Sequence, residues 1–320
     1  MPEQISQNLN QAEMAKITSR ETRVPKPVEL TPEEDSVLLD VLRKAKEAER
    51  TGNKSEAIKL YQVYQDQYEA IRTQRALEKR GEREVSAEVL EQSQKVYDFI
   101  FGEGVYNLQE LYDKGEIIGL DKSQQEAIES EKDETQKYGL ELVMSGGIPR
   151  ADFLQAFKEK YASEFSTEGV YYWDQAQKDI NQTEATLNPD RPTSFYTVAL
   201  KPQGEVNDAH LETMNKTPEQ AEAILQQKQA ENPDLNLKGL ILPEYLLLDA
   251  HHFLDTGKHL DEKHWSYLLG EKVTGTERAL SAGWRSGSRW VGVSSPSGAD
   301  SADGSRFAAV SACLKANLES

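Results

Sequence analysis

The spacing of apolar residues changes once along the chain, and this change limits the possible folds more than any other feature. Between residue 31 and about residue 115, apolar side chains recur every three or four positions, as on one face of an α-helix. From Tyr138 onward short runs alternate instead, and Leu140, Leu142 and Met144 would share one face of a strand. Helical spacing followed by mixed spacing predicts an α+β protein whose N-terminal segment is α-helical.

The helical segment has a sharp predicted start. Residues 1–30 are poor in apolar side chains and are expected to form a mobile tail. The sequence Thr-Pro-Glu-Glu at residues 31–34 then supplies an N-cap, a proline in the first turn and a glutamate at the third helical position, which together form a capping box. We therefore expect residues 31–115 to form a helical bundle or hairpin.

One stretch of this segment resembles a known repeat. The sequence from Ala45 to Tyr61 is similar to one hairpin of a tetratricopeptide-type repeat. A solenoid needs about three stacked copies to bury a continuous core, and one copy is visible. A plain helical bundle that serves for packing or interaction is therefore the favoured interpretation.

The rest of the chain divides into a connecting segment and a larger second domain. Residues 116–137 are highly polar and are expected to form a solvated or bridging helix. Residues 138–320 are expected to form the second domain. Its predicted helices cover residues 153–165, 217–231 and 240–254, and its predicted strands cover residues 140–144, 170–173 and 194–200.

The net charge of the chain limits the classes of partner that it can bind. The 320 residues carry a net charge of −18, which opposes phosphate backbones, so we expect no nucleic-acid partner. From Glu271 onward acids and bases nearly balance, so the acidic excess lies before that residue. Because the chain has neither an apolar run long enough to span a bilayer nor the features of a signal peptide, we expect no membrane span. A cytoplasmic location is the default expectation, and a virion-associated one stays open.

Several kinds of chemistry are disfavoured. Cys313 is the single cysteine, which excludes a disulfide framework and a zinc site of several thiolates, and a small buried side chain is expected there. No phosphate-binding loop, zinc-protease, nucleophile-elbow or EF-hand motif occurs. The sequence Leu-Asp-Thr-Gly at residues 254–257 matches part of an aspartic-protease motif but has no second copy. We therefore expect no enzyme and no cofactor.

Four of the five histidines lie close together, between His251 and His264, among several carboxylates. Imidazoles and carboxylates are zinc ligands, so this cluster could in principle hold a metal. No two of the histidines have the four-residue spacing that would place them on one helical face, and Gly257 interrupts the cluster. We expect solvated side chains around a helix-turn-helix and no metal site.

The segment of residues 285–303 is built mostly from Ser, Gly, Ala, Asp and Arg. This composition alone favours a flexible surface loop. However, Val291 and Val293 alternate with their neighbours, which places both valines on one face of a strand and the neighbours on the other. An apolar strand is also expected directly afterwards, at residues 306–310. These features favour a surface segment anchored to a fixed core.

Short segments of the last third of the chain occur in a recognisable order. They are residues 241–248, 256–261, 265–270, 283–284, 291–293 and 306–310. In this order they resemble the variable proteins of diversity-generating retroelements. Those proteins carry a C-type-lectin-like domain, related in fold to the formylglycine-generating enzyme, and the resemblance implies such a domain within residues 138–320. It implies neither sugar binding nor a calcium site.

The resemblance also implies how residues 285–303 arose. In that family, error-prone copying at adenines turns Asn codons into codons for Ser, Gly, Ala, Asp, Arg and Tyr. The composition of the segment fits this outcome. Tryptophan departs from it, because the usual Asn codon cannot become a Trp codon. Trp284 would then belong to the scaffold, and Trp290 to the scaffold or to a different starting codon.

These considerations lead to the hypothesis of a ligand-binding protein that displays a hypervariable surface to an unknown protein or surface ligand. Small polar side chains would supply adaptable hydrogen bonds, and Trp and Arg would supply anchor area, as in a paratope. The predicted ligand-facing residues are Arg285, Ser286, Ser288, Arg289, Trp290, Gly292, Ser294, Ser295, Ser297, Ala299, Asp300, Ser301 and Asp303. The alternative is an intracellular helical adaptor or structural protein without a diversified site, for which residues 31–115 would hold the partner. An enzyme with a hidden site comes third.

Overall fold

The computed structural model describes residues 31–80, 83–129, 140–144, 146–166, 168–173, 176, 191–192, 194–200, 213, 215–272, 279–294, 304–305 and 307–310. The predicted tail of residues 1–30 and Cys313 lie outside these residues. The chain divides into two compact units, Met1–Arg75 and Ala76–Ser320. Within the described residues, no helix is both long and apolar enough to cross a bilayer.

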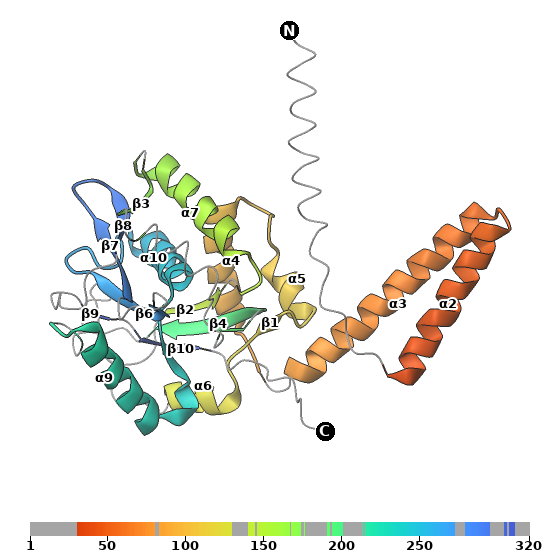
Figure 1. Cartoon of the computed structure of the whole chain (residues 1–320), viewed down its shortest axis with the longest axis horizontal. Coiled ribbons are helices and arrows are strands. Elements are labelled where there is room, and N and C mark those ends of the chain that lie inside the picture. Colours follow the sequence, from red (N-terminus) through yellow and green to blue (C-terminus); the bar gives the residue numbers. More distant parts are fainter. Residues whose placement is uncertain are drawn as a thin grey trace, which may run out of the picture. The chain divides into compact units, whose positions relative to one another are not determined.

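The structure is a mixture of helices and strands, which confirms the predicted α+β class (Figure 1). The α-helices are α2 (Pro32–Arg50), α3 (Lys54–Arg80), α4 (Ala87–Phe101), α5 (Leu108–Asp113), α6 (Lys122–Glu129), α7 (Arg150–Glu164), α9 (Pro218–Glu231) and α10 (Leu242–Thr256). The strands are β1 (Ile117–Ile118), β2 (Leu140–Met144), β3 (Val170–Tyr172), β4 (Phe195–Leu200), β5 (Leu237–Gly239), β6 (Ser266–Lys272), β7 (Ala279–Arg285), β8 (Trp290–Ser294), β9 (Gly304–Ser305) and β10 (Phe307–Val310).

The first unit is built around the antiparallel pair α2 and α3, which lie side by side (Figure 1). The predicted capping box opens α2: the Thr31 backbone N–H donates to the Glu34 carboxylate at 2.7 Å, and the Glu34 N–H donates to the Thr31 hydroxyl at 3.3 Å. Gly52 turns the chain with a φ of +79°, a value that suits glycine. Among the described side chains of this pair, the buried apolar ones are Leu38, Ala45 and Ala57.

The second unit contains two five-stranded sheets. The first sheet has the order β1-β4-β10-β5, with β2 also pairing with β4. All six residues of β4 are buried, so this strand forms the middle of the sheet. The final strand β10 lies between β4 and β5 and pairs antiparallel with both.

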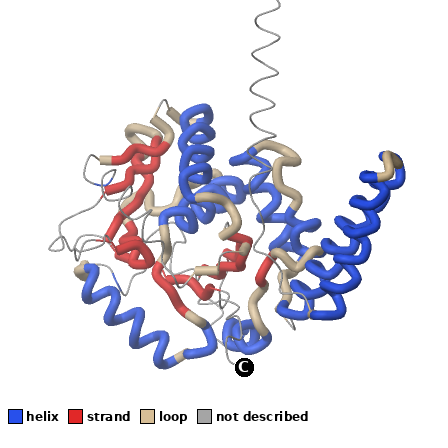
Figure 2. Tube along the Cα trace, turned by 45° about the vertical axis from the view of Figure 1, so that its right-hand side comes forward, coloured by secondary structure: helices blue, strands red, loops and turns tan. Residues whose placement is uncertain are grey.

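The second sheet has the order β3-β8-β7-β6-β9. Its centre is the antiparallel pair β7 and β8, and β3 adds to the edge of β8 in parallel. Helix α10, whose residues Leu242–His252 are all buried, contacts β2 of the first sheet and β6 and β7 of the second. Helices flank the strands of this unit (Figure 2). Because α10 contacts strands of both sheets, it joins them in one hydrophobic core.

Two regions differ from the sequence-based expectation. Helices α4 and α5, predicted to belong to a bundle of residues 31–115, lie in the second unit, where α4 contacts β2, α7 and α10. The predicted polar helix of residues 116–137 begins instead with the short strand β1, which pairs with β4. Only α6 is helical among its described residues, and it buries Ile128. Tertiary contacts available to a few apolar residues outweighed the polar composition here.

Candidate functional site

The second sheet has an inner face in the core and an outer face that is only partly covered. Val291 and Val293 are fully buried on the inner face, as their alternation predicts. Their neighbours Trp290, Gly292 and Ser294 lie on the opposite face. Over β6, this outer face is covered by α9, through contacts such as that of Ala221 with Tyr267 and Leu269. Over β8 it carries a different surface.

Four aromatic side chains gather on the outer face beside β8: Tyr171, Trp173, Trp265 and Trp290, which together we name the aromatic face. All four are partly exposed. Tyr171 stacks on Trp290 with ring centroids 4.4 Å apart, and Trp173 lies 5.1 Å from Tyr171 and 5.4 Å from Trp265. Partly exposed aromatic clusters provide rigid contact area at a low cost in conformational entropy.

Two glycines form the floor beneath these rings. Gly283 and Gly292 are paired across β7 and β8. A Cβ on Gly292 would lie 2.6 Å from the ring of Trp265 and 2.9 Å from the ring of Trp173, and a Cβ on Gly283 would lie 2.9 Å from Trp265. Gly292 therefore lies on the predicted face, but it is buried under two tryptophans. It shapes the site without offering a side chain to a ligand.

Arg285 covers part of the aromatic face from the end of β7. Its guanidinium carbon lies 5.1 Å from the ring centroid of Trp173 and 5.5 Å from that of Trp265, which is cation–π geometry. The side chain is nonetheless exposed. The turn that follows holds the exposed residues Ser286, Ser288 and Arg289, and it is closed by the Arg289 backbone N–H, which donates to the Arg285 carbonyl at 2.7 Å.

The structure brings together part of the predicted set. Arg285, Trp290, Gly292 and Ser294 share one face of the hairpin of β7 and β8, and Ser286, Ser288 and Arg289 form its exposed turn. Ser295, Ser297, Ala299, Asp300, Ser301 and Asp303 lie outside the described residues. Sequence reasoning missed Tyr171, Trp173 and Trp265. The parallel pairing of β3 with β8 places Tyr171 and Trp173 here. Trp265 directly precedes β6, which pairs with the other side of β7.

The close packing of Gly292 under two tryptophan rings predicts that an added methyl group will lower stability. We expect Gly292→Ala to destabilise the second unit by about 1–3 kcal/mol, because the new Cβ overlaps two packed rings that must move. All four tryptophans of the chain lie in the second unit, so the shift of the urea midpoint can be followed by tryptophan fluorescence. The matched control is Gly287→Ala in the turn, where a Cβ meets nothing within 4 Å. Equal midpoints for the two variants would contradict the packing described.

A buried polar network supports the hairpin from behind. The carboxylate of Asp249 on α10 accepts hydrogen bonds from the Leu260 backbone N–H at 2.7 Å and the Tyr161 hydroxyl at 2.9 Å. It also contacts Nδ1 of His259 at 2.9 Å, and the His259 ring stacks on Trp284 of β7 with centroids 3.4 Å apart. Burial, together with the nearby carboxylate, raises the pKa of the Tyr161 hydroxyl well above its usual value.

This network corrects the expectation of solvated histidines. His251, His252 and His259 are all buried, with exposures of 7%, 6% and 4%. The expectation was wrong because the middle of α10, which carries His251 and His252, is enclosed by the rest of the second unit. His259 lies after this helix and is buried between Asp249 and Trp284. Among the described residues, no group of three or more His, Cys, Asp or Glu side chains is placed to hold a metal ion.

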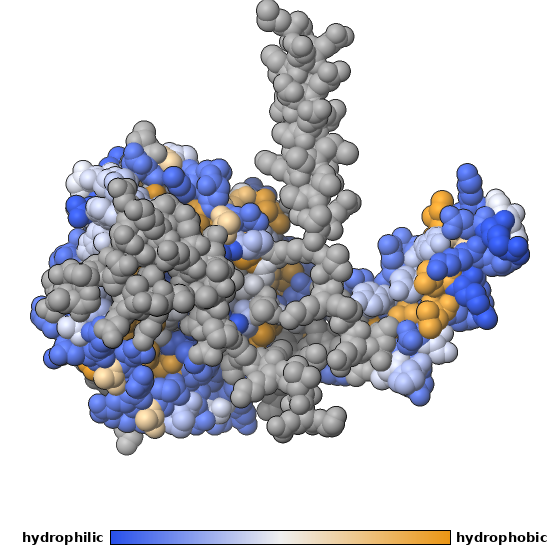
Figure 3. Space-filling model, in the orientation of Figure 1, coloured by the Kyte–Doolittle hydropathy of each residue, from blue (hydrophilic) through white to orange (hydrophobic). Residues whose placement is uncertain are grey.

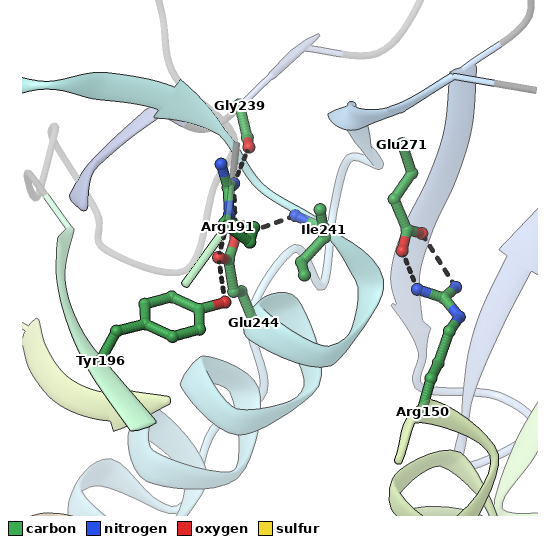
Figure 4. A network of polar contacts seen from close by, with 7 residues as sticks. All are labelled: Arg150, Arg191, Tyr196, Gly239, Ile241, Glu244 and Glu271. Carbon is green, nitrogen blue, oxygen red and sulfur yellow. Dashed lines mark hydrogen bonds and ion pairs between the residues drawn. The ribbon is translucent and has the colours of Figure 1, made fainter. Parts of the chain in front are cut away.

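A second buried network holds the start of α10 against strands β4 and β5 (Figure 4). Arg191 forms a two-point ion pair with Glu244 at 2.6 and 3.0 Å and also donates to the Gly239 carbonyl at 2.6 Å. Glu244 further accepts from the Tyr196 hydroxyl at 2.7 Å and from the Ile241 backbone N–H at 3.0 Å. Each of these side chains makes at least one contact within the network, which joins α10 to β4 and β5, although Nη1 of Arg191 is buried without a hydrogen-bond partner among the described residues.

A similar buried ion pair joins Arg150, at the start of α7, to Glu271 of β6 (Figure 4). Both side chains are almost completely buried. The buried acid–base pairs Arg191–Glu244 and Arg150–Glu271 thus hold helices against neighbouring segments. The exposed chemistry of the second sheet lies on the aromatic face and its arginines.

Comparison of the chain with protein-family models, with curated proteins and with solved structures finds no match. The candidate site is therefore defined by its own geometry. It consists of the aromatic face, the arginine that covers it and the exposed turn between β7 and β8.

Proposed function

We propose that this chain is a ligand-binding protein that recognises a partner through the aromatic face and the turn between β7 and β8. The observation that carries this proposal is the position of Arg285 and Trp290, both predicted from the sequence, on one sheet face with three further aromatic rings. Tryptophan, tyrosine and arginine are the residues most enriched at the energetic centres of protein interfaces. A C-type-lectin-like scaffold and diversification of residues 285–303 belong to the same proposal.

The arrangement of the hairpin supports a surface that can vary. Its inner valines are fully buried and hold the strand in the core, whereas the turn residues Ser286, Ser288 and Arg289 are exposed. Exposed turn residues tolerate replacement far better than core residues do, because no packed neighbour has to adjust. A fixed core with replaceable outward side chains is the physical requirement for a diversified binding surface.

Binding is tested by selecting peptides from a random displayed library on the immobilised full chain. We expect the selected peptides to lose about tenfold or more of their affinity for Trp290→Ala, because truncating a central aromatic anchor removes its contact area. The matched control is Ile58→Ala, which removes an exposed apolar side chain from α3 of the first unit. Binding that survives the loss of Trp290 would sink the proposal.

The alternative, a helical adaptor, has one observation in its favour. Apolar side chains reach the surface of the pair α2 and α3 (Figure 3), among them Val37, Leu39, Ile58 and Val63, which are 41–69% exposed. Peptides that lose affinity for Ile58→Ala and not for Trp290→Ala would establish this alternative.

Diversification has a separate test at the level of DNA. We expect the DNA near the coding region to contain a near-copy of the codons for residues 285–303 that differs mainly at adenines and lies beside a reverse-transcriptase gene. A flanking sequence without such a copy would contradict diversification but would leave peptide binding by the aromatic face to the experiment above.

A further inference from the structure

We infer that the partner presents a single carboxylate next to an apolar or aromatic side chain, and that this carboxylate binds the guanidinium of Arg285 with Arg289 adding charge from the same turn. The inference rests on the proposed function, since it concerns the same surface. It adds the chemical class of the ligand: an acidic segment of a partner protein.

The distribution of charge supports a carboxylate on this surface. The first 80 residues carry as many acidic as basic side chains, so the whole excess of −18 lies in residues 81–320. Within this acidic region, residues 279–294 contain two arginines and no carboxylate. The local positive charge governs contact, because charges beyond about 8 Å are largely screened at physiological salt.

The same distribution disfavours a polyanion. A nucleic acid or another chain of phosphates would extend over the acidic remainder of the second unit and be repelled there. A single carboxylate can contact the two arginines without extending over that remainder. The charge pattern therefore fits a short acidic segment of a protein and opposes a nucleic acid.

Arg285 is already oriented for such a contact. Its guanidinium lies over the rings of Trp173 and Trp265, and the side chain is exposed, so its N–H groups can donate to a ligand. No described carboxylate pairs with Arg285 or Arg289. An arginine held by stacking loses less conformational freedom when it binds, and its forked donors match the two oxygens of a carboxylate.

One polar group of the aromatic face lacks a partner among the described residues. The indole N–H of Trp290 is buried from solvent and has no hydrogen-bond partner among the described residues. Buried donors in proteins are nearly always satisfied. Because this N–H has almost no surface open to solvent, an oxygen of a bound segment reaches it only if a neighbouring side chain moves aside.

The backbone at Arg289 provides a variant that keeps the turn. Arg289 has a φ of +57°, a left-handed conformation in which glycine is unstrained and other residues are disfavoured. Arg289→Gly therefore removes the charge while favouring the observed turn. A second variant, Arg285→Gln, keeps a planar group over the tryptophans and removes the charge.

The test uses two pools of synthetic peptides, identical except that each glutamate beside a tryptophan in one pool is a glutamine in the other. Binding to the full chain is measured by fluorescence anisotropy. We expect the glutamate pool to bind about tenfold or more tightly than the glutamine pool. The reason is that an arginine–carboxylate pair, in which both partners are charged, is stronger than a hydrogen bond from arginine to a neutral amide. Arg289→Gly and Arg285→Gln should bring the affinity of the glutamate pool down towards that of the glutamine pool.

The outcomes separate this inference from the proposed function. Equal affinities of the two pools, both lost in Trp290→Ala, would overturn the carboxylate and leave the binding surface in place. If neither pool shows binding that depends on Trp290, the inference and the proposed function are both overturned. A preference for glutamate that persists in both arginine variants would place the carboxylate elsewhere and overturn the inference alone.

Discussion

Replacing Glu244 by alanine is expected to destabilise the second unit by about 3–5 kcal/mol, because the change leaves the buried charge of Arg191 without its partner. Burial by itself lowers the pKa of Arg191, but the adjacent Glu244 carboxylate outweighs this and raises it, so the arginine stays charged. The same change removes the acceptor of the Tyr196 hydroxyl and of the Ile241 N–H. Urea unfolding followed by tryptophan fluorescence measures the loss.

The matched control for this change is Glu219→Ala. Glu219 also follows a proline at the start of a helix, in this case α9, but its side chain is exposed. We expect the midpoint of Glu219→Ala to stay close to that of the unaltered chain. A midpoint for Glu244→Ala equally close to the unaltered value would show that the buried network contributes nothing to stability.

Replacing Asp249 by alanine is expected to cost about 3 kcal/mol or more, since each buried donor left unsatisfied costs about 1–3 kcal/mol. The change removes the acceptor of the Leu260 N–H and of the Tyr161 hydroxyl, and the contact of His259. Because the His259 ring lies on Trp284, we also expect a change in tryptophan emission of the folded protein at zero denaturant. Both quantities come from one urea titration.

Asp255→Ala is the control for this second change. Asp255 lies in the last turn of the same helix, α10, but is exposed. Its replacement should leave both the midpoint and the emission spectrum close to those of the unaltered chain. If Asp249→Ala and Asp255→Ala behaved alike, the support of β7 by this network would be refuted.

Local patterns predicted many elements of the fold. The capping box at Thr217 starts α9, and Pro243 stands in the first turn of α10, as expected. Alternation located β2, and a run of β-branched and aromatic residues located β3, each to within a residue or two. These successes share a cause: caps and periodicity depend on neighbours within a few residues, and the sequence displays those neighbours directly.

Long-range pairing could not be predicted. The final strand follows the hairpin of β7 and β8 in sequence, but it joins the other sheet, between β4 and β5. The aromatic face likewise brings Tyr171 to Trp290 across a parallel register of β3 and β8. No local pattern encodes which strands meet, because every buried strand can satisfy its hydrogen bonds with several partners.

The sequence by itself determined the α+β class, the ends of the capped helices and the inward direction of Val291 and Val293, because these depend on local hydrogen bonds and on the alternation of side chains along a strand. The tertiary structure alone decided that three of the clustered histidines are buried and that Gly292 lies under two tryptophans. It also decided that Arg285 covers those tryptophans. Burial and ring contacts are properties of segments far apart in the chain, and they exist only once the sheets have paired around α10.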